Sequence, residues 1–185
     1  MKGLEDQIKG LLEINKEIET RLKSVENKLC QLEDQSRREN LLFFGIGDDG
    51  NESWEVCERK LTQFIKDKLG IDKDIVFQRV HRLGRPRAGV NARPIIAKFL
   101  LFKDKELVLR NAHKLKNQAC SISEDFCQRT REKRKMLLPH LKKAKEDDKR
   151  AFLRVDTLYI EGTRFHVDGN TVKNSNTGAP LTWSN

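Results

Sequence analysis

The first 32 residues carry a regular pattern of apolar positions. The spacing between them alternates between four and three residues. The stripe consists of Leu4, Ile8, Leu11, Asn15, Ile18, Leu22, Val25, Leu29 and Leu32. This 3.5-residue repeat is typical of a coiled coil, and a lone helix cannot bury such a stripe. We therefore predict that residues 1–37 form a helix that associates with other copies of the chain as a parallel coiled coil.

Two features of this stripe bear on the number of chains. Asn15 takes a core position, where a polar side chain either fixes register and oligomer state or is a tolerated defect in a short coil. Arg21 and Glu26 flank the apolar Leu22 and Val25 in a pattern associated with three-stranded coils. Arg21 could pair with Glu26 across the seam while its stem covers the core. The pattern favours a homotrimer, and a dimer remains the alternative.

Residues 38–124 alternate between strand and helix patterns. An apolar run at 41–46, bounded by glycine and aspartate, indicates a buried strand. Ser53 can cap a helix that ends at Gly70. The remaining elements are expected as strand 75–83, basic loop 84–93, strand 94–100, helix 102–115 and strand 119–123. The order βαββαβ predicts a ferredoxin-like α+β domain.

A different, strongly basic module is expected over residues 125–170. Asp125 with Gln128 fits a capping box at the start of a helix. Ten Lys or Arg and four Asp or Glu lie within residues 127–150, and Pro139 should kink or split the helix. Short strands are predicted at 151–155, 157–160 and 163–167, which makes this a small α+β domain. The polar residues 171–185 are predicted to form a flexible tail.

Charge is distributed unevenly along the chain. Residues 1–37 hold seven Lys or Arg and eight Asp or Glu, whereas the whole chain has a net charge of +9. The globular part therefore carries all of the excess positive charge, and oligomerisation multiplies it. A polyanion is the expected partner of such a surface. No apolar run approaches the roughly 18 residues of a membrane span, so no membrane partner is expected.

The residues that most often build metal and catalytic sites are scattered. The cysteines form no CxxC pair, which argues against a zinc site or a secreted disulfide scaffold and favours a reducing cytosolic or nuclear setting. The histidines have no cysteine or carboxylate at ligand or catalytic spacing. These residues are Cys30, Cys57, Cys120, Cys127, His81, His113, His140 and His166. We therefore predict no metal, no cofactor and no enzymatic activity.

Four short motifs follow the coil in a characteristic order: RRENLLFFGI at 37–46, RVHRLG at 79–84, RPIIAKF at 93–99 and SEDF at 123–126. With them, the chain resembles the RNA-binding first-reading-frame protein of LINE retrotransposons. The resemblance implies a homotrimer whose arms each carry an RNA-recognition-motif domain and a C-terminal domain that close on single-stranded nucleic acid.

The resemblance also implies a biological role. The protein would bind single-stranded RNA, and single-stranded DNA as well. It would coat the element's RNA in a cytoplasmic ribonucleoprotein particle, with the nucleus as a second compartment, and act as a nucleic-acid chaperone in transposition. It would meet the element's reverse transcriptase, a separate protein, by association on RNA. The coil is much shorter than in mammalian relatives, through either truncation or a natively short stalk.

An RNA-recognition motif normally stacks bases on aromatic side chains of its two central strands. If Phe99 is aligned with the final aromatic of that consensus, Pro94 and Ile96 stand where the stacking aromatics should be. Phe43 and Phe44 are adjacent, so one of them faces the core, and alternation alone does not tell which. Binding should therefore depend on phosphate contacts, with a steep salt dependence and little sequence preference.

The candidate phosphate contacts are the cations of the hinge after the coil, the basic loop, the second helix, the C-terminal helix and the strand after it. They are Arg37, Arg38, Arg85, Arg87, Arg93, Arg110, Arg131, Lys133, Arg134, Lys135 and Arg154. By resemblance, the hinge arginines, the loop arginines, Arg110, the pair before Pro139 and the strand arginine fall where family members contact RNA. These residues are Arg37, Arg38, Arg85, Arg87, Arg93, Arg110, Arg134, Lys135 and Arg154. For each of them the alternative is a solvated surface charge.

A second interpretation keeps the coil but changes the partner. The chain would then be a host-domesticated adaptor whose βαββαβ domain binds protein. Such an adaptor should expose an apolar patch and has no need for ten cations around one helix.

Overall fold

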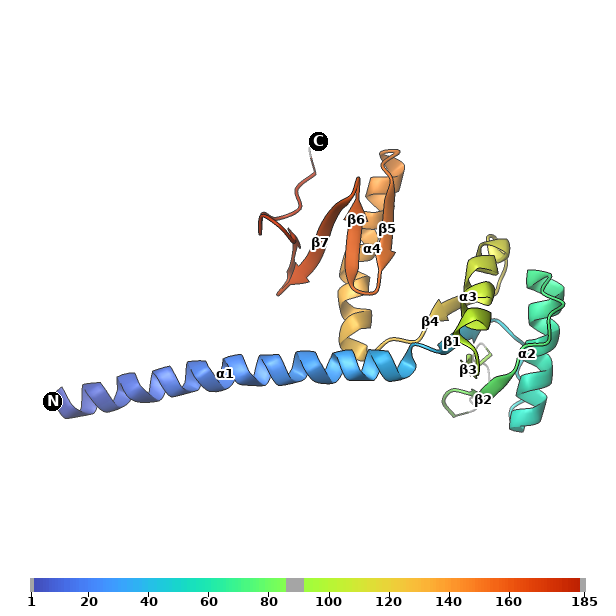
Figure 1. Cartoon of the computed structure of the whole chain (residues 1–185), viewed down its shortest axis with the longest axis horizontal. Coiled ribbons are helices and arrows are strands. Elements are labelled where there is room, and N and C mark those ends of the chain that lie inside the picture. The colour runs from blue at the N-terminus through green and yellow to red at the C-terminus, as the bar shows by residue number, and fades with distance from the viewer. Residues whose placement is uncertain (1, 86–91, 184–185) are drawn as a thin grey trace. The chain divides into compact units, whose positions relative to one another are not determined.

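The structure is a computed structural model that describes residues 2–85 and 92–183 (Figure 1). The chain is α+β with a long N-terminal helix and antiparallel sheets, as the sequence predicts. It divides into two compact units. One unit consists of residues 34–125, and the other combines residues 1–33 with residues 126–185.

The first element, α1 (Lys2–Arg37), is a single long helix with an uncovered apolar stripe. Every apolar member of the predicted heptad stripe is between 51% and 65% exposed. Leu12 and Ile14, which lie just before Asn15, are exposed to a similar degree. Within the described part of the chain, nothing covers this stripe. Large apolar side chains in such a continuous exposed row indicate a surface for association.

The unit of residues 34–125 contains one four-stranded sheet in the order β2-β3-β1-β4, with all neighbours antiparallel. Its elements, in chain order, are β1 (Asn40–Phe44), α2 (Trp54–Leu69), β2 (Phe77–Arg82), β3 (Ile95–Phe99), α3 (Phe102–Asn111), the 3-10 turn η1 (Ala112–Leu115) and β4 (Ser121–Glu124). The predicted caps of α2 are confirmed. The hydroxyl of Ser53 accepts a hydrogen bond from the Val56 amide, and Gly70 ends the helix with a φ of 64°.

Both helices pack on the same face of this sheet and leave the other face open. Phe43 is fully buried there and meets Phe64 edge-on, with 6.2 Å between ring centroids. Leu61 of α2 and Val108 of α3 belong to the same core. Phe44 points the opposite way and is 36% exposed. The structure thus answers which of the adjacent phenylalanines faces solvent.

A buried ion-pair network closes one end of the sheet. The guanidinium of Arg82 donates to Glu52 at 2.8 Å and to the Ile46 carbonyl at 2.8 Å. Lys60 donates to the same carboxylate at 2.5 Å. Burial raises the pKa of Glu52, but hydrogen bonds from Arg82 and Lys60 outweigh it and bring this pKa down to about 2. The network ties the loop before α2 to strand β2.

The other unit contains α4 (Gln128–Glu146) and a four-stranded antiparallel meander. The strands lie in chain order as β5 (Ala151–Arg154), β6 (Thr157–Ile160), β7 (Thr163–Asp168) and β8 (Thr171–Asn174). Helix α4 packs on one face of this sheet. The core between them holds Leu137 and Ala144 of the helix and Leu158 of β6, all fully buried.

The capping box predicted at the start of α4 is wrong. The N-cap is Cys127, whose sulfur accepts from the Thr130 amide at 3.4 Å. Asp125 instead accepts hydrogen bonds from Arg37 and Asn40 within the other unit, so it is not available as a cap. Of the two outcomes predicted for Pro139, a kink or a split, the split is wrong, because the helix continues through this residue. Packing of the surrounding turns onto the sheet outweighs the lost hydrogen bond.

The prediction of a flexible tail over residues 171–185 is wrong for the residues that the structure describes there. Residues 171–174 form β8, and the buried Val172 joins the core. Leu181 and Trp183 pack against the same core. The ring nitrogen of Trp183 hydrogen-bonds His140 of α4 at 2.9 Å. The sequence pattern missed this because the segment has few apolar residues and they follow no strand or helix period.

Candidate nucleic-acid interface

One face of α4 carries a row of exposed cations. Arg131, Lys135, Lys142 and Lys145 are all exposed, and their spacing of four, seven and three residues keeps them within a narrow stripe of the helix. The buried side chains of the helix, which include Leu137, lie on a different face. Lys142 of this stripe pairs with Glu146 at 3.7 Å, and the side chains of this pair are 81% and 61% exposed. Solvent-exposed pairs of this kind are weak, so the stripe remains available to an anionic partner.

Two predicted contacts on α4 have internal partners instead. Lys133 forms an ion pair with Asp156 at 2.6 Å. Arg134 donates to the Val155 carbonyl, and its guanidinium lies 4.6 Å from the centre of the Phe126 ring. Both side chains therefore attach the helix to the β5–β6 turn. A phosphate at Lys133 or Arg134 would have to compete with these internal partners, and their assignment as phosphate contacts stays a prediction.

Two predicted contacts in the unit of residues 34–125 are also structural. The guanidinium of Arg93 donates to both carboxylate oxygens of Asp48, at 2.7 and 2.9 Å, and its side chain is 15% exposed. This hydrogen-bonded pair holds the pKa of Asp48 far below its ordinary value. Arg37 pairs with the buried Asp125 at 3.1 Å. Each of these arginines neutralises an internal carboxylate, so a phosphate at Arg93 or Arg37 would have to compete with that carboxylate. Their assignment as phosphate contacts stays a prediction.

The other predicted cations are placed as follows. Arg38 is exposed and contacts Glu39 at 3.0 Å, and Arg85 and Arg154 are exposed. Arg110 is exposed too, but it lies on α3, which covers the closed face of the sheet. Arg87 lies outside the described residues. Arg38 and Arg85 are thus the predicted cations of residues 34–125 that remain candidates by exposure and placement.

The open face of the first sheet carries cations that the sequence analysis missed. Arg79 of β2 lies opposite Lys98 of β3 in the strand register, on the side away from the buried Val80. His81 follows on the same side, and burial together with the nearby Arg79 lowers its pKa. A neutral His81 leaves Arg79 and Lys98 as the positive groups of this face. The alternation of buried Val80 with its neighbours was the signal that could have identified them.

No protein-family model and no curated protein matches the chain. In the part of the chain that the structure describes, no helix is both long and apolar enough to cross a membrane. The functional assignment therefore depends on the chemistry of the exposed residues.

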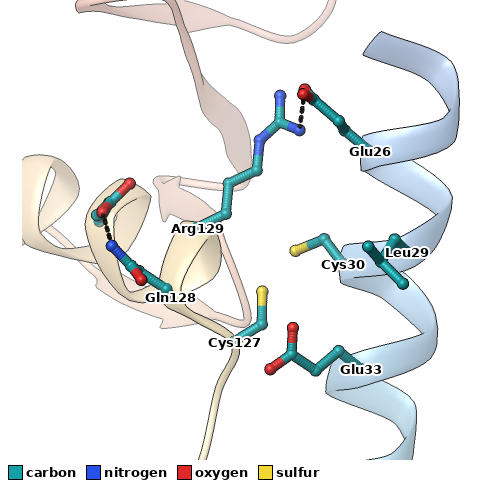
Figure 2. Close-up of a pocket in the computed structure, with 8 residues that line it drawn as sticks. Glu26, Leu29, Cys30, Glu33, Cys127, Gln128 and Arg129 are labelled. Atoms are coloured by element: carbon teal, nitrogen blue, oxygen red, sulfur yellow. Dashed lines mark hydrogen bonds and ion pairs between the residues drawn. The ribbon is translucent and has the colours of Figure 1, made fainter. Parts of the chain in front are cut away.

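A pocket between α1 and the first turn of α4 differs from these basic surfaces (Figure 2). Figure 2 shows Cys30 and Cys127 on its two walls with Glu33 below them, and the two sulfurs lie within 4.8 Å of each other. Arg129 pairs with Glu26 at 3.5 Å across its upper end. Glu132 of α4 lines it as well. Three carboxylates in such a small space disfavour an anionic ligand, so this pocket is not part of the candidate interface.

Proposed function

We propose that the chain is a homotrimeric, largely sequence-independent binder of single-stranded RNA and DNA, with no catalytic activity of its own. The cationic stripe of α4 is the observation that carries this proposal. A row of cations with few acidic neighbours can bind a chain of phosphates. The phosphates repeat along a strand at the same spacing whatever its base sequence, so such binding is largely independent of sequence. Arg79 and Lys98 on the open face of the first sheet add to the same chemistry.

The architecture of residues 34–125 supports an RNA-recognition-motif-like, ferredoxin-like domain. The order βαββαβ, the sheet order β2-β3-β1-β4 and the two helices on one face are what such a domain requires. Its open face offers Phe44 near one end, and Ile96 occupies the middle of β3. A face with this composition can bind a strand through phosphates better than through stacked bases.

The uncovered stripe of α1 supports self-association as a parallel coiled coil. Leu12 and Ile14 lie beside the core positions and widen the stripe around Asn15. A seam restricted to the two core positions suits two helices, whereas a wider apolar face suits a larger bundle. This favours three chains over two. In a single chain Arg21 pairs with Glu17 at 2.6 Å, and in the trimer it would turn to Glu26 of a neighbouring helix.

The resemblance to LINE first-reading-frame proteins carries the proposal further. In that setting the trimer would coat retrotransposon RNA, act as a nucleic-acid chaperone and meet the reverse transcriptase on the RNA. The cytoplasm, and then the nucleus, would be its compartments. Each of these roles requires the binding activity first, so a failure to bind single strands would rule them out together.

Replacing Arg131 and Lys135 with alanine tests the α4 stripe. Affinity for any single strand should fall about tenfold near physiological salt, because two phosphate contacts are lost. The slope of log affinity against log salt should shrink by roughly 1.4. The measurement is fluorescence anisotropy with poly-uridine and poly-adenosine oligonucleotides over a salt series, with a duplex of equal length alongside.

The matched control is the double variant Lys66→Ala and Lys68→Ala, which removes the same charge from the exposed surface of α2. It should change neither quantity by more than a small general field effect. If both double variants behave alike, net charge rather than the α4 stripe governs binding.

Asn15→Ile tests the coil. The variant should stabilise the assembly by about 1.5–3 kcal/mol per chain, the contribution of one buried aliphatic side chain. It should also loosen the choice between two and three chains, because a polar core residue specifies the oligomer. Thermal unfolding at fixed concentration and light scattering on the same samples measure both effects. A dimeric mass for the unaltered chain at micromolar concentration would rule out the trimer.

A second candidate function is the adaptor that binds protein through residues 34–125. One observation favours it: Val76, Leu100, Leu101 and Phe102 are each about half exposed, and the Leu100 amide donates to the Val76 carbonyl at 3.0 Å. They form an apolar patch where β3 leads into α3. Replacing Leu101 and Phe102 with serine should leave strand binding intact under the leading proposal.

A further inference from the structure

The meander sheet has a second face that its own core does not use. Side chains alternate along each strand, so Leu153 and Leu158 face α4 while Phe152 and Tyr159 face away from it. Phe152 lies directly opposite Tyr159 in the β5–β6 register, and Tyr159 lies directly opposite Arg164 in the β6–β7 register. These three side chains therefore form one row across the outward face of the sheet.

The two aromatic rings in this row are stacked. Their centroids lie 4.7 Å apart, and the ring planes differ by 6°. Phe152 is 47% exposed, and neither ring belongs to the hydrophobic core of the unit. A large aromatic side chain normally contributes to stability through burial, which is incomplete for Phe152. A flat, parallel, partly exposed pair offers a surface on which another flat ring can stack.

Cations border the stacked pair. Arg154 is two residues after Phe152 on the same strand, hence on the same face, and Arg164 ends the row beside Tyr159. Both are exposed, and neither has an acidic partner among the residues that the structure describes. Lys173 is on the same side of β8 but pairs with Asp168 at 2.7 Å. The face thus combines π-surface with two cations that no carboxylate of residues 2–85 or 92–183 neutralises.

We propose that this face, which we call the aromatic platform (Phe152, Arg154, Tyr159 and Arg164), is a subsite for single-stranded nucleic acid. An unpaired base stacks on the Phe152–Tyr159 pair, and Arg154 and Arg164 contact the phosphates on either side. Aromatic stacking next to cations is the usual way to bind a single strand without reading its sequence. The inference deepens the binding function proposed above and depends on it.

The chemistry of the platform favours a nucleic acid over a protein. Phe152 is the one large apolar side chain of its outward row, and the other members are a tyrosine and arginines. A protein partner would bury little apolar surface there, whereas protein interfaces depend on a well-packed apolar centre. A base needs one flat ring surface, and its phosphates need the cations. Charge complementarity therefore supports a single strand as the occupant.

Tyr159 is the single tyrosine of the chain, which allows a direct test on the full-length protein. Incorporation of 3-fluorotyrosine gives one ¹⁹F resonance from the platform. We expect this resonance to shift on addition of a short poly-adenosine strand, because the ring current of a stacked base changes the shielding of the fluorine on Tyr159. An abasic strand with the same number of phosphates should shift it far less.

Affinity measurements with Phe152→Leu complete the test. This variant keeps an apolar side chain but loses the π-face, so its affinity for the poly-adenosine strand should fall about 5- to 150-fold, which is the loss expected for one stacked base. Its affinity for the abasic strand and its salt slope should stay unchanged. Phe152→Trp should restore binding. The matched control is Trp54→Leu, which removes an aromatic side chain that is 60% exposed from the other unit and should have no effect.

The outcomes separate the subsite from the function. If the unaltered protein binds no single strand, the proposed function fails as a whole. If it binds with a steep salt dependence while Phe152→Leu binds both strands as the unaltered protein does, the platform is wrong and the function stands. A ¹⁹F shift that follows protein concentration without any nucleic acid would identify the platform as a protein contact and overturn the proposal.

Discussion

A chain in which Leu11 and Ile18 are replaced by glutamine will bind a long single strand about 10²–10⁴-fold more weakly than the unaltered chain. Both residues are more than half exposed on a single helix, so their replacement should leave the two compact units folded. It removes two apolar layers of the coil and with them the link between arms. Once one arm is bound, the linked arms bind at a high effective concentration, and this advantage disappears in monomers.

The same variant should bind a short strand, which reaches only one arm, almost as well as before. Analytical ultracentrifugation on the anisotropy samples reports the oligomeric state. Lys9→Gln with Glu13→Gln is the control, because it changes the same helix outside the apolar stripe and leaves the net charge unchanged. Equal long-strand affinity for the monomeric variant and the unaltered chain would refute a multivalent coat.

Glu52→Ala will destabilise the unit of residues 34–125 by about 3–5 kcal/mol at neutral pH. The reason is the buried guanidinium of Arg82, 8% exposed, which loses its carboxylate and cannot regain water. Lys60 loses the same partner. A urea titration read by hydrogen exchange of peptides from β2 and β3 measures the free energy of unfolding of this unit alone.

The effect should depend on pH in a defined direction. The folded-state pKa of Glu52, about 2, lies below its ordinary value of 4.5. The contribution of the Glu52 carboxylate to the free energy of unfolding is therefore complete above about pH 4.5, and it is lost as the pH falls towards 2. The difference in unfolding free energy between the unaltered chain and Glu52→Gln should shrink across that window.

Asp72→Ala serves as the control for the buried network. Asp72 pairs with Lys66 at 3.5 Å with both side chains largely exposed, so the change should stay within about 0.5 kcal/mol. A loss from Glu52→Ala as small as this would show that the buried pair is not needed for stability.

Local and periodic features were determined by the sequence alone. The heptad stripe predicted one long helix, because the spacing of its apolar residues has the 3.5-residue period of a coiled-coil helix. Ser53 and Gly70 predicted the ends of α2, since a hydroxyl cap and a left-handed glycine act within a few residues. The order of strands and helices along residues 38–124 followed from similar short-range patterns.

Partners that are distant in sequence were decided only by the tertiary structure. The sequence alone gives Arg93 as one more cation of a basic loop. In the structure its guanidinium donates a hydrogen bond to Asp48, which lies 45 residues earlier. The sequence does not tell which of Phe43 and Phe44 is buried. The difference arises because the two helices cover only one face of the sheet, the face that carries Phe43. Charge and hydrophobicity are properties of single residues, whereas burial and pairing depend on what the fold brings opposite each of them.

The aromatic platform shows the same division between sequence and fold. Phe152 and Tyr159 are seven residues apart with a turn between them, and neither belongs to a recognisable stacking motif. Strand register alone places them opposite each other and puts Arg164 at the end of the row. Register depends on which face of the meander α4 covers, because a shift of one residue would turn every side chain to the other face. The sequence therefore determined that this chain is basic and has an apolar stripe suited to oligomerisation, and the packing of α4 on its sheet decided which side chains form an outward surface.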